Sequence, residues 1–221
     1  MDIQGNIRDL ERRIAAAAER ANRSPAEITL VVVTKTISPS LIQQAFEAGI
    51  RHFGENSIQE AKSKIEKLSG LEPPPIWHMI GHLQTNKAAA AVELFHMIQS
   101  VDSIRLAEAL SRHAQRNIST LLQVNISGEA SKSGFSPSEV SSAAEQIASL
   151  PHLDIEGLMT IAPLSNNPKE VRPVFRKLKL LRDSLGLEHL SMGMTDDFEV
   201  AIEEGATILR IGRAIFGERK E

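Results

Sequence analysis

The sequence contains neither cysteine nor tyrosine among its 221 residues. The absence of cysteine excludes disulfides, thiolate catalysis, iron–sulfur clusters and zinc sites built on cysteine. The absence of tyrosine removes every mechanism that needs a phenol as acid, base or nucleophile. Aromatic residues are scarce as well, at 4% of the chain. These absences narrow the chemistry that the chain can perform.

The chain also lacks a strong charge imbalance and a long hydrophobic run. Its 25 basic and 28 acidic side chains give a net charge of −3, which offers nucleic acid no general basic surface. The longest strongly apolar run, residues 28–33, is far shorter than the ~20 residues that span a bilayer. No signal-peptide pattern opens the sequence. We therefore expect a soluble cytoplasmic protein, monomeric, with one domain over residues 1–221 and no membrane or nucleic-acid partner.

Helical and strand periodicities alternate along the whole chain. A first amphipathic helix carries apolar residues at Ile7, Leu10, Ile14 and Ala18. Strands are then expected at residues 28–33, 50–54, 76–80, 96–101, 120–126, 155–161, 189–192 and 206–211. Helices are expected between them at residues 38–49, 58–68, 85–92, 102–113, 136–147, 168–185 and 196–204.

Several of these boundaries are marked by capping residues. Ser38 with Pro39 is typical of a helix start, and Asp102 and the box at residues 136–139 are expected to cap two later helices. Strands that alternate with helices predict a parallel sheet with right-handed crossovers. Eight such units favour a (β/α)8 TIM barrel with an extra N-terminal helix. A doubly wound open sheet remains the alternative, because spacing does not reveal the order of the strands.

Barrel enzymes carry their chemistry on the loops that follow the strands, and Lys35 lies directly after the first strand. A lysine at the end of a buried strand faces a low-dielectric pocket, where the neutral amine is favoured and can attack a carbonyl. The alternative is that Lys35 only marks the point at which the strand leaves the core for solvent. Position alone does not decide between these two interpretations.

The last two loops, residues 191–195 and 210–214, are rich in small and hydroxyl residues and precede helical segments. Backbone N–H groups and a hydroxyl at adjacent helix starts are suited to an anion, and the loops after strands 7 and 8 are the common phosphate site of barrels. Thr195 could instead be a simple helix cap. Asp196 and Asp197 would repel a phosphate unless they point away from it.

Other constellations in the sequence are weaker. His78 and His82 lie on a predicted strand, where four residues span ~13 Å, too far to share a metal ion. No metal site is therefore expected. Glu55 is interpreted as a helix cap, whereas Asn56 could hydrogen-bond a ligand. The glycine-flanked segment 128–134 lacks the Gly-Lys-Ser/Thr of a phosphate-binding loop, and no dinucleotide-binding fingerprint is present.

Seven stretches, in the same order, resemble the motifs of one known family, the pyridoxal 5′-phosphate (PLP) homeostasis proteins, whose fold is that of the alanine racemase N-terminal domain. They are VVTKT (32–36), HFGEN (52–56), WHMIGHLQTNK (77–87), VNI (124–126), GLMTI (157–161), SMGMTDD (191–197) and RIGRAIFG (210–217). Each stretch is unspecific alone, but together they are highly specific. The resemblance implies a single barrel of the fold-type III PLP-binding class.

The resemblance also implies a role for each matching residue. Lys35 matches the lysine that forms an aldimine with PLP, and Arg210 matches the arginine that faces the pyridine nitrogen. The other matches are the phosphate-binding positions Ser191, Gly193, Met194, Thr195, Gly212 and Arg213, and the ring-lining positions Asn56, His78 and Met159.

The chain departs from the family pattern at two positions. Ser57 stands where the family commonly has tyrosine, which removes an aromatic surface beside the site. Thr195 stands where the family commonly has serine, and this change keeps the hydroxyl.

Catalysis is not expected from this set of residues. An arginine at the pyridine nitrogen leaves it unprotonated and weakens the ring as an electron sink. Racemases of this fold use a tyrosine from an added β domain, and the chain has no tyrosine and no residues left for such a domain. We therefore expect a non-catalytic carrier that maintains intracellular vitamin B6, with PLP-dependent apoenzymes as candidate partners. A slow amino-acid racemase and a Schiff-base aldolase for a phosphorylated substrate are the alternatives.

Overall fold

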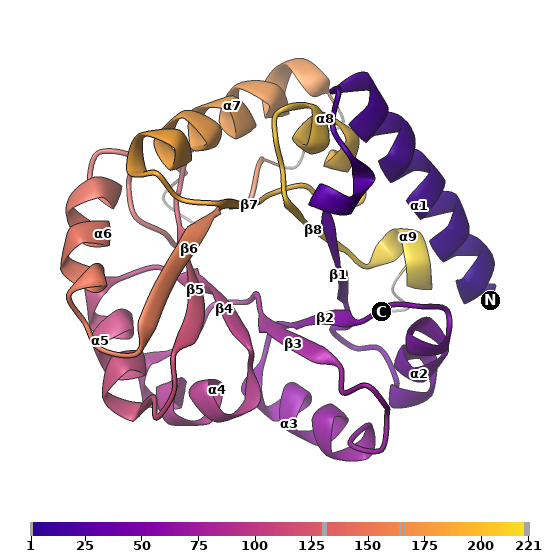
Figure 1. Cartoon of the computed structure of the whole chain (residues 1–221), viewed down its shortest axis with the longest axis horizontal. Helices are drawn as coiled ribbons and strands as arrows, with labels where there is room; N and C mark the ends of the chain where they lie inside the picture. The colour runs from indigo at the N-terminus through magenta and orange to yellow at the C-terminus, as the bar shows by residue number, and fades with distance from the viewer. Residues whose placement is uncertain (1, 130–131, 164, 166, 219–221) are drawn as a thin grey trace.

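Eight parallel strands close into a barrel in the computed structural model, which describes residues 2–129, 132–163, 165 and 167–218 (Figure 1). The strands are β1 (Thr29–Val33), β2 (His52–Glu55), β3 (Ile76–Met79), β4 (Met97–Val101), β5 (Ile118–Gln123), β6 (Leu153–Met159), β7 (His189–Ser191) and β8 (Ile208–Ile211). Each strand pairs with the next in sequence, and β8 pairs with β1 in the register Val31 to Arg210. The predicted (β/α)8 barrel is confirmed, and the open-sheet alternative is wrong.

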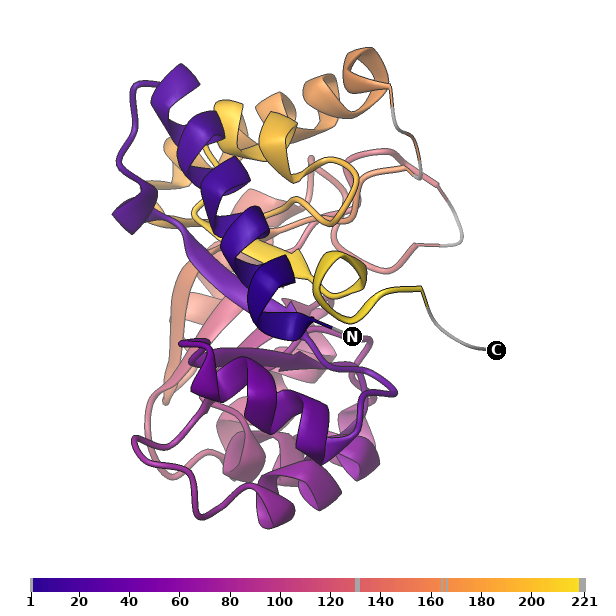
Figure 2. The ribbon, with the colours of Figure 1, turned by 90° about the vertical axis from the view of Figure 1, so that its right-hand side faces the viewer.

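Helices cover the outside of the barrel on all sides (Figures 1 and 2). They are α1 (Ile3–Arg20), α2 (Pro39–Glu47), α3 (Ile58–Lys67), α4 (Ala88–Leu94), α5 (Ile104–His113), α6 (Val140–Ala148), α7 (Pro168–Leu185), α8 (Phe198–Glu203) and α9 (Arg213–Phe216), with 3-10 turns at Pro25–Glu27 and Thr85–Lys87. The extra N-terminal helix α1 packs against α2, α8 and α9. Its first turn is capped by Asp2, whose carboxylate accepts the N–H of Gly5.

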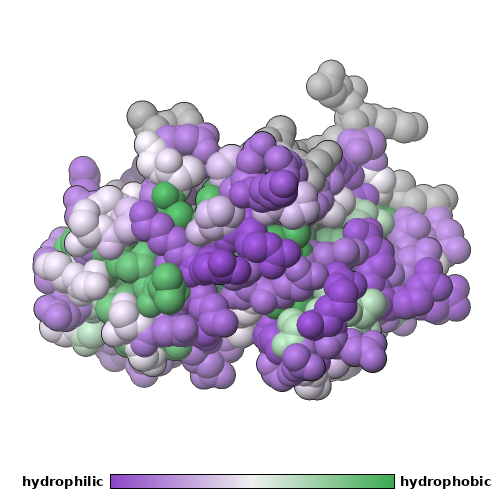
Figure 3. Space-filling view, turned by 90° about the horizontal axis from the view of Figure 1, so that it is seen from above, coloured by the Kyte–Doolittle hydropathy of each residue, from purple (hydrophilic) through white to green (hydrophobic). Residues whose placement is uncertain are grey.

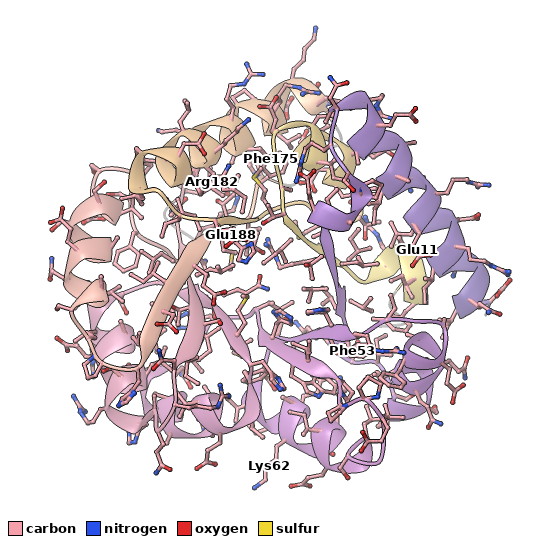
Figure 4. The ribbon with its side chains drawn as sticks, in the orientation of Figure 1. Glu11, Phe53, Lys62, Phe175, Arg182 and Glu188 are labelled. Atoms are coloured by element: carbon pink, nitrogen blue, oxygen red, sulfur yellow. The ribbon has the colours of Figure 1, made fainter. Side chains whose placement is uncertain are left out.

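The buried apolar side chains form two clusters, one on each side of the strands. The larger cluster fills the layer between strands and helices, where Phe53 of β2 and Phe175 of α7 are fully buried (Figure 4). The smaller cluster lies inside the barrel and consists of Val31, Leu121, Met159 and Ile208. Side chains alternate along a strand, so every second residue of each strand points into the barrel.

Several predicted boundaries are wrong by a few residues. The fifth strand ends at Gln123 rather than at residue 126, and α6 begins at Val140 rather than at the expected box, although Glu139 does accept the N–H of Ser136. Ser103, and not Asp102, caps α5, because its hydroxyl accepts the N–H of Leu106. At α5 the two neighbouring residues Asp102 and Ser103 are both good caps, and sequence alone does not decide between them.

The surface over α7 and α1 is mostly hydrophilic, with apolar side chains in small separate groups (Figure 3). Leu180 of α7 is the most exposed large hydrophobic side chain of the described residues. None of the described helices is long and apolar enough to cross a membrane.

Candidate cofactor site

Alternation along the strands directs five of the eleven predicted site residues toward the inside of the barrel. In β1 and the loop after it, Val31, Val33 and Lys35 face inward, whereas Val32 and Thr34 face the helices. The same alternation directs His78, Met159, Ser191 and Arg210 toward the barrel interior. These four side chains are almost completely buried.

A chain of hydrogen bonds, which we call the inner polar chain, crosses the barrel from β8 to β2. Arg210 Nη1 donates to Ser191 Oγ at 2.5 Å, and Ser191 donates to Gln99 Oε1 at 2.6 Å. Gln99 Nε2 lies 3.1 Å from His78 Nδ1, and His78 Nε2 lies 2.9 Å from His52 Nδ1. Because Arg210 can only donate, the direction of every bond follows, and His78 accepts from Gln99 and donates to His52.

Burial shifts the pKa of two members of this chain, His78 and Arg210. It lowers the pKa of His78 to about 3, so the ring is neutral at pH 7 and can accept a hydrogen bond at Nδ1. Burial also lowers the pKa of Arg210 to about 10, while the nearby Asp197 carboxylate opposes that shift. Arg210 thus stays a cation, and its Nη2 donates to the carbonyl of Thr160 at 2.8 Å.

A pocket of about 480 Å³, the Lys35 pocket, opens at the carboxyl ends of β1, β7 and β8. This volume lies within the ~300–1,000 Å³ that is usual for small-molecule sites. Lys35 from the first loop and Thr195 from the seventh share it with Arg210 at its inner side. The described residues that line it are Val33, Lys35, Ile37, Met194, Thr195, Asp196, Arg210, Gly212, Arg213, Phe216, Gly217 and Glu218.

The turn after β7 owes its shape to Gly193. Its φ of +97° is a left-handed conformation, and a Cβ there would lie 2.7 Å from the Cβ of Ala201. The turn that follows is closed by Asp197, whose Oδ1 accepts the N–H of Met194 at 2.6 Å. Burial raises the pKa of Asp197, and this hydrogen bond opposes the shift. The N–H of Met194, which the resemblance assigns to phosphate, therefore already has an acceptor.

Asp196 and Asp197, which could repel a phosphate, both have hydrogen-bond or ion-pair partners within the protein. Asp197 is turned back onto its own loop, as described above, and Asp196 pairs with the guanidinium of Arg213. Thr195 is not a helix cap, because α8 begins at Phe198 and Asp197 is the residue before it. The helices after β7 and β8 have only six and four residues, so side chains supply more of the pocket's polarity than helix ends do.

Asn56 lines a second, neighbouring pocket of about 250 Å³ at the same face, together with His82 and Gln123. Its Oδ1 is buried and has no hydrogen-bond partner among the described residues. An unmet buried acceptor is costly, and a hydroxyl or N–H donor of a ligand would satisfy it. His82 pairs with Asp102 at 3.0 Å and shares no ligand with His78.

The structure thus separates the predicted site residues into two groups. Lys35, Met194, Thr195, Arg210, Gly212 and Arg213 line the Lys35 pocket. His78, Met159, Ser191 and Gly193 do not line it. They lie in the barrel interior or in the turn beside it, and Asn56 belongs to the neighbouring pocket.

Sequence reasoning missed Gln99, and the expected role of Glu55 was wrong. Gln99 is a polar residue in the middle of a predicted buried strand, a signal that could have found it. Glu55 does not cap α3, since Ser57 accepts the N–H of Glu60. It is completely buried and pairs with Lys64 at 2.7 Å. Lys64 lies on the apolar face of α3, and a lysine at such a position indicates a buried charge that needs a partner.

Replacing Gln99 by methionine is expected to destabilise the fold without changing the packed volume greatly. The Ser191 hydroxyl would lose its acceptor and His78 Nδ1 its donor. Each buried group left unpaired costs ~1–3 kcal/mol, so the free energy of unfolding is expected to fall by about 2–6 kcal/mol. Urea titration measures this change. A loss below ~0.5 kcal/mol would mean that the inner polar chain contributes no stability.

The residues present fit a phosphorylated aldehyde cofactor such as PLP. Lys35 supplies an amine, while Thr195 and Arg213 supply a hydroxyl and a cation to an anionic group. Arg210 uses two of its donors on Ser191 and Thr160 and presents the rest of its guanidinium to the pocket. The unmet Oδ1 of Asn56 offers an acceptor at the edge of the same face.

Comparison with known proteins identifies the family. The model of the alanine racemase N-terminal domain matches residues 6–220. The chain is 44% identical to the pyridoxal phosphate homeostasis protein of Aquifex aeolicus, covering 94% of each chain. It is 43% identical to the protein of the same name from Pseudomonas aeruginosa, covering 98% of this chain and 96% of that one.

Solved structures agree with this result. PipY of Synechococcus elongatus, solved with PLP bound, superposes with a TM-score of 0.82 at 38% identity, over 92% of this chain and 100% of that one. An alanine racemase from Corynebacterium glutamicum has a TM-score of 0.69 at 19% identity, and the match covers 60% of the racemase, which shows a shared fold only. The chain therefore belongs to the alanine racemase N-terminal domain family, and within it to the pyridoxal phosphate homeostasis proteins.

Proposed function

We propose that this protein binds PLP covalently through Lys35 and serves in PLP homeostasis. The observation that carries the proposal is the convergence of Lys35, Thr195 and Arg210 on one pocket from three different strand ends. The names of the relatives and the PLP-bound structure of PipY support the same ligand. When bound, PLP supplies an aldehyde that an amine can convert to an imine with release of one water.

The residues of the pocket then have distinct tasks. Lys35 provides the nucleophilic amine. The Thr195 hydroxyl donates a hydrogen bond to the phosphate. Arg213 contributes positive charge there when its guanidinium leaves Asp196 and pairs with the phosphate instead. Arg210, fixed by Ser191 and Thr160, presents N–H donors to the pyridine nitrogen. Ser191, whose hydroxyl accepts from Arg210 and donates to Gln99, holds Arg210 in place.

The same residues favour a carrier over an enzyme. Arg210 remains protonated and cannot give a proton to the pyridine nitrogen, so that nitrogen stays neutral. The pocket offers no phenol, because the sequence has no tyrosine. The natural consequence is that PLP is stored and handed on to PLP-dependent apoenzymes.

An absorption spectrum of the purified protein tests the proposal. Addition of PLP is expected to produce a yellow protein-bound band, because the imine extends the conjugation of the ring. Borohydride should bleach this band and fix the label to the polypeptide. If the bound fraction shows only the spectrum of free PLP and no label is fixed, covalent binding is wrong.

Replacement of Thr195 by alanine tests the phosphate site. A hydrogen bond to a charged group contributes ~1.5–3 kcal/mol, so PLP affinity is expected to fall about ten- to a hundredfold. Thr195→Ser keeps the hydroxyl and serves as the matched control, with affinity near that of the unchanged protein. Equal affinity of the alanine and serine variants would remove Thr195 from the phosphate site.

A further inference from the structure

Lys64 of α3 is a buried lysine whose hydrogen bonds are all satisfied by its neighbours. It is 4% exposed, and its Nζ lies 2.6 Å from the carbonyl of Thr34, 2.7 Å from Glu55 Oε1 and 2.6 Å from Glu60 Oε1. An ammonium group has three N–H donors, so these three acceptors use all of them. The two carboxylates offset the cost of burying the cation. We call this group, Lys64 with Glu55 and Glu60, the Lys64 clamp.

The Lys64 clamp holds the backbone on both sides of Lys35. On one side, the carbonyl of Thr34 accepts from Lys64. On the other side, the N–H of Thr36 donates to Glu60 Oε1 at 2.5 Å. Glu60 and Lys64 lie one turn apart on α3 and are themselves paired. A single helix turn thus fixes the peptide groups that flank the nucleophilic lysine.

The backbone at Thr36 needs such support. Its φ of +66° is left-handed, a conformation that is unfavourable for a β-branched residue. Conformations of this kind persist only where the surroundings enforce them, and they cluster at functional sites. The left-handed residue turns the chain directly after Lys35, which lies on the pocket side while Thr34 lies on the helix side.

Glu55 anchors the clamp to the sheet. It ends β2 with no exposed surface, and its Oε1 accepts from both Lys64 and the hydroxyl of Thr34. Thr34 directly follows β1, which pairs with β2, and Glu55 is the last residue of β2. The loop that carries Lys35 is therefore attached to β2 and α3 through the buried side chains of Glu55 and Lys64.

We propose that Glu60 and Lys64 are positioning residues for Lys35, which aim its amine into the Lys35 pocket. This inference rests on the proposed covalent binding of PLP at Lys35. Because of the clamp, we do not expect PLP to label Lys64, a second lysine beside the same loop: its Nζ donates to three acceptors and has no free electron pair as an ammonium. Of the described residues, Lys35 is the lysine that lines the pocket.

The rate of covalent capture separates this role from simple stabilisation. Two probes are compared: PLP, and pyridoxine 5′-phosphate, which has an alcohol in place of the aldehyde and the same ring and phosphate. Glu60→Ala is expected to slow the growth of the protein-bound PLP band about ten- to a hundredfold, because the amine is misplaced. The affinity for pyridoxine 5′-phosphate should change less than about twofold, since Lys35 does not bond to it.

Two variants of α3 serve as controls. Glu60→Gln keeps a carbonyl oxygen for the N–H of Thr36 and is expected to recover much of the capture rate. Lys62→Met removes an exposed lysine on the same helix and should leave both readouts unchanged (Figure 4). Lys64→Met is measured as well, with circular dichroism to establish that it folds. If Lys64→Met does not fold, the comparison of Glu60→Ala with Glu60→Gln is sufficient for the test.

The outcomes are distinct. If the unchanged protein captures no PLP, the proposed function fails. If the unchanged protein captures PLP and Glu60→Ala captures it equally fast, the positioning role is wrong. Parallel losses for both probes would also overturn it, because they would indicate a general effect on the fold. Slow capture with intact pyridoxine 5′-phosphate binding, restored by Glu60→Gln, is the result that the Lys64 clamp predicts.

Discussion

Replacement of Lys35 by alanine is expected to abolish the protein-bound absorption band completely. Among the described residues, Lys35 is the one lysine that lines the pocket with Thr195 and Arg210, and alanine has no amine with which to form a covalent bond. Some PLP should still bind without the covalent link, because Thr195 and Arg213 remain. The measurement is the visible spectrum with PLP, followed by borohydride and mapping of the labelled peptide.

Lys87 provides the matched control for this experiment. It lies in the 3-10 turn Thr85–Lys87 after β3 and is not among the residues that line the Lys35 pocket. Lys87→Ala should keep the band and the label at Lys35. A label that maps to Lys87, or a band that survives in Lys35→Ala, would refute the assignment of Lys35.

The order of elements and the location of the pocket could be predicted from sequence because both follow from local pattern. Hydrophobic periodicity and caps such as Ser38 define where each strand and helix lies. Parallel strands in succession place all loops that follow them at one end of the sheet, so Lys35 and Thr195 were expected at the same face. Closure into a barrel, in contrast, depends on β8 pairing with β1, which spacing does not reveal.

The contacts inside the barrel could not be predicted for the same reason. Ser191 and Gln99 are 92 residues apart in sequence and meet only because the barrel closes. Nothing local to Ser191 shows that its hydroxyl serves Arg210. The Lys64 clamp is a comparable case, since it joins β1, β2 and α3 through side chains whose partners depend on the register Val33 to Gly54.

The charge state of Arg210 limits what the pocket can do to an amino acid. A protonated pyridine nitrogen draws electrons from the α-carbon, and a neutral one does so much less. Arg210 has a pKa of about 10 and is held by Ser191 and Thr160, so it donates hydrogen bonds and keeps its protons at pH 7. If PLP binds as proposed, with its pyridine nitrogen against Arg210, ionisation of the α-carbon of an amino acid at this site is therefore expected to be slow.

The protein is expected to bind amino acids at the PLP site without exchanging their α-protons at enzymatic rates. Exchange needs an electron sink and a positioned acid or base, and racemisation needs one on each face. Lys35 can serve one face, but the described lining of the Lys35 pocket contains no tyrosine, histidine or cysteine for the other, and its two carboxylates, Asp196 and Glu218, both pair with Arg213. The measurement is deuterium wash-in at the α-carbon of L- and D-alanine in D2O, followed by mass spectrometry and chiral chromatography.

The control and the decisive outcome both involve Lys35. Lys35→Ala defines the background exchange caused by free or loosely bound PLP, which itself catalyses the reaction slowly. The unchanged protein should exceed this background only slightly, although addition of an amino acid can still shift its spectrum by displacing the Lys35 amine. Exchange at ~1 per second or faster, with inversion and dependent on Lys35, would overturn the carrier function and establish a racemase.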